Sequence, residues 1–178
     1  MIPLQSAGAN TAVFGHWLTR HLEGLPGYQD HQVYYDHGDP KGSPNVAAIK
    51  GIYGESVSLI SQLAQVDVLV AQPDREIRVV VEIEERFSSP KKIVGDVFTL
   101  LMCNRFSVRL SGQHEYFRIT PRTKLVIAGT MKVKGSKREQ LERVILPRIR
   151  QFTMPEDAID PRKVSFILKR GSRMCWRS

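Results

Sequence analysis

The sequence has few cysteines and no long apolar run, and both absences narrow the possible functions. Its two cysteines, Cys103 and Cys175, lie far apart and form no Cys-x-x-Cys pair. This spacing predicts neither a disulfide scaffold nor a cysteine-based metal site, and it suits a reducing compartment. No stretch of about 18 apolar residues is present, and the opening residues lack the pattern of a secretion signal. We therefore expect a cytoplasmic protein that does not bind a membrane.

The signatures of several enzyme classes are also missing. The five histidines form no HExxH motif or close ligand pair. No glycine-rich phosphate loop occurs, and no serine lies in the Gly-x-Ser-x-Gly turn of a hydrolase. The pattern therefore gives no support for a zinc protease, a nucleotide-binding enzyme of the common glycine-rich types or a serine hydrolase.

Acidic residues are scarce in the last third of the chain. Residues 118–178 contain 16 Lys and Arg against 5 Asp and Glu, whereas residues 1–117 contain 10 against 13. Lysines and arginines that neutralise phosphates release counterions and bind a polyanion without regard to its sequence. The basic third therefore indicates a nucleic-acid partner, and a merely solvated basic face remains the alternative.

The hydrophobic pattern predicts one α/β domain that spans residues 1–178. The length and the 42% apolar content are ordinary for a single globular domain. Residues 24–54 are rich in glycine and proline, so we expect this region to be irregular or loop-rich. Strand, helix, strand order predicts a mixed sheet with right-handed crossovers. Helices are expected over residues 11–23, 90–103 and 137–152, and strands over 32–35, 66–72, 77–85, 123–131 and 163–169.

Three carboxylates interrupt two of these apolar strands. Because side chains alternate along a strand, Val80, Glu82 and Glu84 share one face. Asp67 lies on the preceding strand, opposite or diagonal to Glu82, so the negative charges repel one another unless a cation lies between them. Mg²⁺ or Mn²⁺, which prefers carboxylate oxygens, would meet this need. In the alternative, Glu82, Glu84 and Glu85 lie on a solvent-exposed edge and pair with Arg75, Arg78 or Arg86.

Two lysines follow the carboxylates closely. Ser89 is predicted to cap the next helix, with Pro90 at its first position. Lys91 and Lys92 then lie in the first turn, where the helix dipole disfavours cations by a few tenths of a kcal/mol to about 1 kcal/mol. We expect them to fold back over the carboxylates and to help hold a phosphate, although a solvated helix start would explain them too.

Asp67, a turn, and then Glu82-Ile83-Glu84 on the next strand resemble the PD-(D/E)xK nuclease superfamily. The order of elements over roughly residues 55–170 is similar to that family, and Asp67, Glu82 and Glu84 occupy the three motif positions. The resemblance implies a restriction-endonuclease-like mixed β-sheet flanked by helices. It also implies that Asp67 and Glu82 are metal ligands and that the backbone carbonyl of Ile83 completes the site. The literal Pro73-Asp74 pair lies in the turn and is interpreted as a decoy.

The match departs from the family at Glu84, which occupies the position of the motif lysine. Some restriction enzymes of the superfamily have Glu or Gln at this position, and other members move the lysine to the following helix, where Lys91 and Lys92 stand. Glu84 is therefore either a third metal ligand or a replacement of the lysine. Glu55 is either an extra acid of the site or an ordinary loop glutamate.

These residues lead to one functional hypothesis and one rival. We expect a Mg²⁺-dependent endonuclease that hydrolyses the phosphodiester bonds of DNA, and a homodimer is left open. The rival is a non-catalytic nucleic-acid-binding module with a nuclease-like fold, and a subunit that only mediates protein contacts is a third class. The residues expected to contact the nucleic-acid backbone are Arg138, Arg143, Arg148 and Arg150.

Overall fold

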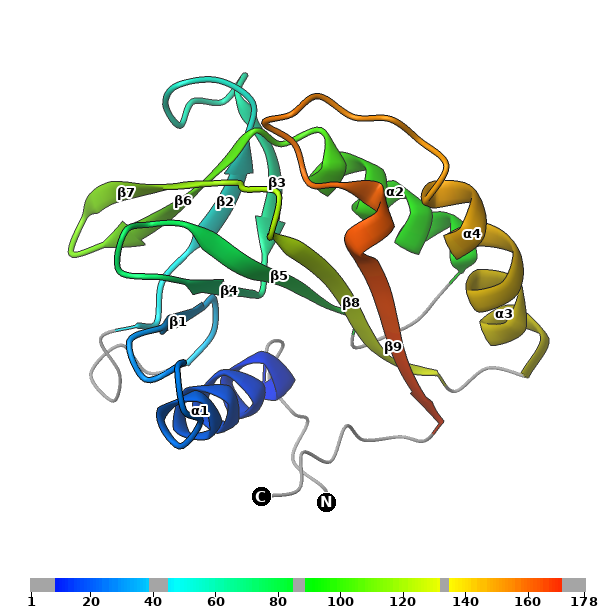
Figure 1. Ribbon diagram of the computed structural model, residues 1–178, viewed down its shortest axis with the longest axis horizontal. Helices are drawn as coiled ribbons and strands as arrows, with labels where there is room; N and C mark the ends of the chain where they lie inside the picture. Colours follow the sequence, from blue (N-terminus) through cyan, green and yellow to red (C-terminus); the bar gives the residue numbers. More distant parts are fainter. Residues whose placement is uncertain (1–8, 39–44, 85–88, 132–134, 171–178) are drawn as a thin grey trace, which may run out of the picture.

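The apolar strands around the carboxylates form the centre of a five-stranded mixed sheet (Figure 1). The computed structural model describes residues 9–38, 45–84, 89–131 and 135–170. The strand order is β1-β4-β5-β8-β9. β1, β4 and β5 are antiparallel neighbours, whereas β5, β8 and β9 run parallel, which confirms the expected mixed α/β sheet. The strands are β1 (Gln32–Tyr35), β4 (Val68–Ala71), β5 (Ile77–Glu84), β8 (Lys124–Met131) and β9 (Val164–Arg170).

A second, antiparallel sheet was not predicted from the sequence. Its strand order is β3-β2-β6-β7, and β3 runs directly into β4 of the first sheet. The prediction of an irregular region 24–54 was wrong at β2, where a Cβ added to Gly51 would lie 2.6 Å from Cys103 Sγ. This glycine allows close packing in a strand rather than marking a loop. The strands are β2 (Ile49–Ile52), β3 (Gln62–Val66), β6 (Arg105–Leu110) and β7 (Gln113–Arg118).

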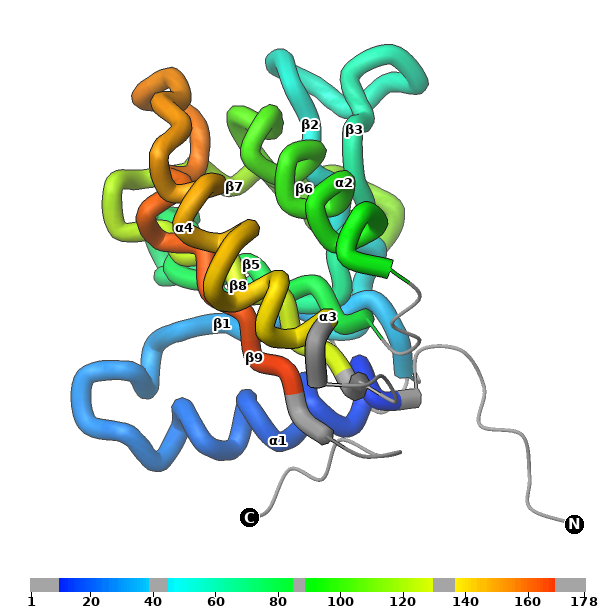
Figure 2. Tube along the Cα trace, turned by 90° about the vertical axis from the view of Figure 1, so that its right-hand side faces the viewer, coloured from blue at the N-terminus to red at the C-terminus, as the bar shows by residue number. Residues whose placement is uncertain are grey.

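Helices cover both faces of the five-stranded sheet (Figures 1 and 2). Helix α1 (Ala9–Glu23) packs on one face, where Phe14 joins Val81 and Ile83 in one apolar cluster. On the other face, α2 (Pro90–Leu101) packs against the larger cluster that contains Val80. The remaining helical segments on that side are α3 (Gly135–Gln140), a π-helical turn (Leu141–Ile145) and α4 (Leu146–Ile149).

The predicted start of α2 is confirmed in detail. Ser89 has an extended backbone, and its hydroxyl accepts a hydrogen bond from Lys92 N at 3.3 Å, with Pro90 at the first helical position. The next helix, α3, begins at Gly135, two residues before the predicted start at residue 137. No helix among the described residues is long and apolar enough to span a membrane.

Candidate functional site

Asp67 lies at the junction of the two sheets, between β3 and β4. The register that pairs Val68 with Val81 places Asp67 beside Glu82, as the sequence predicted. The Asp67 carboxylate accepts a hydrogen bond at each oxygen: the hydroxyl of Thr11 donates to Oδ1 at 2.9 Å, and the backbone N–H of Ile83 donates to Oδ2 at 2.7 Å. Burial raises the pKa of Asp67, and these two hydrogen bonds oppose the rise.

Glu82 has a carboxylate whose negative charge is poorly compensated by its surroundings. Its buried Oε2 atom has no hydrogen-bond partner among the described residues. Burial, followed by the negative charges of Asp67 and Asp96, raises the pKa of Glu82 from 4.5 to about 8. A buried carboxylate without a partner is costly, so this side chain favours either a proton or a cation.

Glu84 is paired with a lysine from the following helix. Its side chain points to the α2 side of the sheet, where Lys92 Nζ donates a hydrogen bond to Glu84 Oε2. Burial opposes the charge of Lys92, but the hydrogen bond and negative charge of Glu84 outweigh it and raise the lysine pKa. Gly129 on β8 leaves room here, because a Cβ at that position would lie 3.3 Å from Glu84 O. Lys91 is exposed and has no ion pair with any described residue.

Two further acids, which were not predicted from the sequence, adjoin these three. Asp96 on α2 lies 4.0 Å from Lys92 Nζ, and burial raises its pKa. Asp36, just after β1, donates its backbone N–H to Asp67 O at 2.9 Å and adds a negative charge next to that carboxylate. Asp96 could have been linked to Lys92 from the sequence, because side chains four residues apart on a helix are neighbours. Nothing in the sequence linked Asp36 to Asp67, since the contact depends on the pairing of β1 with β4.

The donor set is chemically that of a hard divalent cation, because carboxylate oxygens dominate it. The unpartnered Oε2 of Glu82 beside Asp67 fits such an ion. In the described part of the chain, no three His, Cys, Asp or Glu side chains form a group that could hold a metal ion. Glu84 is engaged by Lys92, so a role as third ligand requires that this ion pair open.

The exposed-edge alternative fails for the two arginines that the structure describes. Arg75 pairs with Glu115 at 3.2 Å, and Arg78 lies 3.8 Å from Glu76, so neither neutralises Glu82. Arg86 lies outside the described residues. Among the described cations, Lys92 lowers the pKa of Glu82, whereas His37 lowers that of Asp67.

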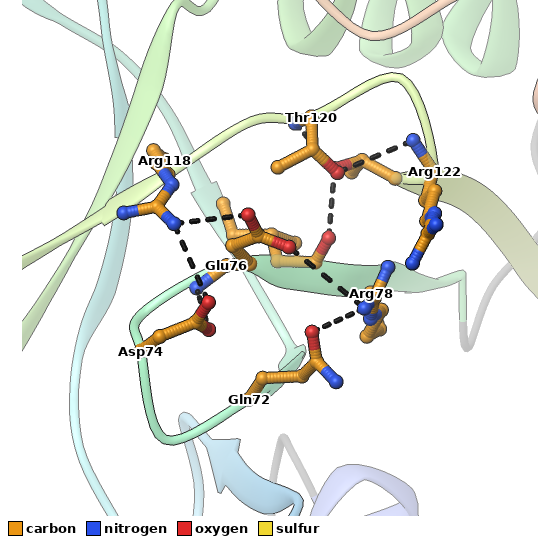
Figure 3. Close-up of polar contacts among 9 residues, drawn as sticks. Gln72, Asp74, Glu76, Arg78, Arg118, Thr120 and Arg122 are labelled. Carbon is orange, nitrogen blue, oxygen red and sulfur yellow. Dashed lines mark hydrogen bonds and ion pairs between the residues drawn. The ribbon is translucent and has the colours of Figure 1, made fainter.

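The Pro73-Asp74 pair lies at the far end of β5 from Glu82 and Glu84. Figure 3 shows Asp74 and Glu76 pointing toward Arg118, with contacts of 3.4 and 2.9 Å. These pairs fasten the turn between β4 and β5 to the end of β7. Asp74 thus has a structural partner and does not lie at the site. This position agrees with the interpretation of the Pro73-Asp74 pair as a decoy.

Glu55 is not brought to the site either. It lies in the loop between β2 and β3 and forms an ion pair with Arg105 at 3.0 Å. This loop precedes β3, whereas Asp67 follows the other end of β3. The position of Glu55 therefore agrees with an ordinary loop glutamate.

The four predicted phosphate-binding arginines are distributed along the helical segments over residues 135–150. Arg138 pairs with Glu142 at 2.8 Å, and Arg143 pairs with Glu139 at 2.8 Å. Arg150 donates to the carbonyl of Val164, the first residue of β9. Since β9 runs parallel to β5 and begins at Val164, Arg150 lies toward the opposite end of the parallel strands from Glu84. Arg148 is exposed and has no ion pair within the described residues.

Comparisons with models of known protein families, with curated proteins and with solved structures found no match. The functional proposal accordingly rests on the geometry of the site. The main features are the Asp67 carboxylate held by Thr11 and Ile83, the Glu82 Oε2 atom, which has no hydrogen-bond partner among the described residues, and the ion pair of Glu84 with Lys92.

Proposed function

We propose that this protein is a Mg²⁺-dependent endonuclease that hydrolyses phosphodiester bonds of DNA. The observation that carries the proposal is the buried carboxylate of Glu82, which lies beside Asp67 with one oxygen unpartnered. Two adjacent, partly buried carboxylates repel each other, and either a proton or a bound cation relieves the repulsion. The mixed sheet flanked by helices agrees with the resemblance to the PD-(D/E)xK superfamily.

Asp67 and Glu82 would hold the metal ion, with the backbone carbonyl of Ile83 completing the set. Mg²⁺ or Mn²⁺, when bound, would lower the pKa of a water and polarise a phosphate oxygen. Thr11 and the Ile83 N–H fix the Asp67 carboxylate, so one ligand is already oriented. A cation would also favour the charged form of Glu82, whose pKa is raised to about 8 in its absence.

Lys92 takes the role of the motif lysine in this proposal. Its ammonium group reaches the carboxylates from the first turn of α2, and Glu84 holds it there. An ammonium at this position donates hydrogen bonds to a phosphate oxygen and stabilises the negative charge that develops during hydrolysis. Glu84 then acts as the anchor of the lysine.

Replacing Lys92 with alanine should lower cleavage, whereas the same change at Lys91 should leave it unchanged. The two lysines are adjacent, but only Lys92 is paired with Glu84. Loss of one such donor costs on the order of 100-fold or more in rate. The measurement is cleavage of plasmid DNA with Mg²⁺, with thermal unfolding to confirm that both variants are folded. Equal losses of cleavage rate in the two variants would show that the rate depends on the charge of the helix and not on the position of Lys92.

A path for the DNA backbone runs from the carboxylates along the helical segments beside β8 and β9. Arg138 and Arg143 are in exposed ion pairs, which contribute little stability and can exchange a carboxylate for a phosphate. Arg148 adds an exposed charge on the same segments. Arg150 is instead a structural residue, because its guanidinium bonds the carbonyl of Val164.

DNA binding should weaken steeply with salt, and the slope should fall when these arginines are removed. Each phosphate neutralised on duplex DNA contributes about 0.9 to the slope of log K against log salt. Replacing Arg138, Arg143 and Arg148 together with glutamine should therefore reduce the slope by up to about 2.7. The measurement is fluorescence anisotropy with labelled duplexes at several salt concentrations.

A matched control removes the same charge from the region around the turn between β4 and β5. Arg75, Arg118 and Arg122 lie near this turn, at the opposite end of β5 from the acids. Their replacement with glutamine should leave the salt slope unchanged. A slope that falls equally in both triple variants would contradict the proposed path.

Two observations favour a second candidate, a nucleic-acid-binding module without catalytic activity. Lys92 already neutralises Glu84, and the described residues include no group of three metal-binding side chains. Such a module would bind DNA with a strong salt dependence but would not cleave it with Mg²⁺ or Mn²⁺. Binding without cleavage, by protein that is folded and free of nuclease contamination, would select this candidate.

A further inference from the structure

Thr11 lies in the first turn of α1, and its hydroxyl points out of its own helix. A threonine further along a helix often bonds the carbonyl four residues earlier, as Thr19 does with Gly15 O at 2.9 Å. Because α1 begins at Ala9, no carbonyl of the helix stands four residues before Thr11. The hydroxyl donates instead to Asp67 Oδ1 at 2.9 Å, and Thr11 is only 1% exposed.

This contact joins segments that are 56 residues apart in the sequence. Asp67 comes from the junction of β3 and β4, and its other oxygen is held by the backbone N–H of Ile83 on β5. Donors on both oxygens, from two different elements, restrict rotation of the carboxylate. They also favour its charged form against the effect of burial.

We propose that Thr11 is a positioning residue for the metal-binding carboxylate of Asp67, so that helix α1 forms part of the active site. The inference rests on the proposed function, since it assigns the hydroxyl a role behind a metal ligand. Thr11 touches neither the metal nor the substrate. Its hydroxyl sets the direction in which Asp67 presents its remaining lone pairs.

Groups that orient a metal ligand from behind have measurable effects on metal binding. Their removal typically costs 10–100-fold in metal affinity or activity. Thr11→Val keeps the shape of the side chain and removes the donor, whereas Thr11→Ser keeps the donor and removes a methyl group. A positioning role therefore predicts loss in the valine variant and recovery in the serine variant. A packing role predicts the reverse order.

The experiment measures Mn²⁺ affinity of the full chain by calorimetry, with Thr19→Val as the matched control on the same helix. Thr11→Val should bind Mn²⁺ about 10–100-fold more weakly than wild type. Thr11→Ser and Thr19→Val should bind it as wild type does. In DNA cleavage, Thr11→Val should lower kcat and leave the KM for DNA unchanged, because the arginines that bind the backbone are intact. Thermal unfolding monitors the fold, and Thr11→Ala replaces the valine variant if that variant does not fold.

The possible failures are distinguishable. Mn²⁺ binding by wild type that is unchanged in Thr11→Val would overturn the role of Thr11 and leave the proposed metal site standing. Weak binding in both Thr11→Val and Thr11→Ser would also overturn it, because the hydroxyl would not be the group that matters. Absence of Mn²⁺ binding by wild type would overturn the proposed function and this inference with it.

Discussion

Glu82→Gln should abolish Mg²⁺-dependent cleavage of DNA, with a loss of more than about 100-fold. Removal of groups that merely orient metal ligands already costs 10–100-fold, so a lost ligand should cost more. The substitution preserves the shape of the side chain and replaces the carboxylate, whose buried Oε2 has no hydrogen-bond partner among the described residues. The measurement is the rate of nicking and linearisation of supercoiled plasmid, with EDTA as the metal-free control.

The variant also serves as its own purity control, because a contaminating nuclease would copurify with wild type and Glu82→Gln alike. DNA binding at low salt should be retained, since the arginines of the helical segments are unchanged. Equal cleavage by the two proteins would remove Glu82 from the active site.

Glu82→Gln should also change how the stability of the metal-free protein depends on pH. The folded-state pKa of Glu82 is raised to about 8 from 4.5, mainly by burial. Between these two values the folded protein keeps a proton that the unfolded chain has lost. Wild-type stability should therefore fall as pH rises through this window, by up to about 1.4 kcal/mol per pH unit from this group, and the fall should end above the folded pKa.

The glutamine variant lacks this group. Its free energy of unfolding, relative to that of wild type, should therefore increase from pH 5 to pH 8, by several kcal/mol in total. Urea unfolding in EDTA at pH 5, 6, 7 and 8 measures the difference, and the acids that do not interact with Glu82 cancel in the comparison. If the free energy of unfolding depended on pH in the same way for both proteins, the Glu82 carboxylate would not be desolvated. Its repulsion with Asp67 would then no longer support a metal site.

The strands that carry the acids were predictable because their residues follow strong local rules. β-branched runs on both sides of a turn predicted β4 and β5, and alternation predicted the shared face of Val80, Glu82 and Glu84. Lys92, which is paired with Glu84, lies in the predicted helix. Its proximity to the carboxylates was expected because only a short connection separates β5 from α2.

The second sheet escaped prediction because three of its four strands lack such a signal, and the alternation in β6 (RFSVRL) was not used. β3 (QLAQV) and β7 (QHEYFR) are polar edge strands, and β2 contains Gly51. The apolar face of this sheet becomes evident only when Phe106, Val108 and Phe117 pack into the core. Thr11 was similarly invisible, since its link to Asp67 depends on how α1 docks and not on any spacing in the sequence.

The structure also changes the design of experiments on Asp67. From the sequence, its removal relieves repulsion and should leave the fold intact. The carboxylate accepts hydrogen bonds from Thr11 and Ile83, however, so alanine would leave two donors without a partner. Asp67→Asn, which keeps an acceptor, is the better variant for activity measurements.

The most direct test of the metal site is a calorimetric titration of Mn²⁺ into the metal-free wild-type protein and Glu82→Gln. The account predicts saturable binding by the wild type that is lost or strongly weakened in the variant. Absence of binding by wild-type protein, or identical binding by both proteins, would contradict the assignment of Asp67 and Glu82 as metal ligands.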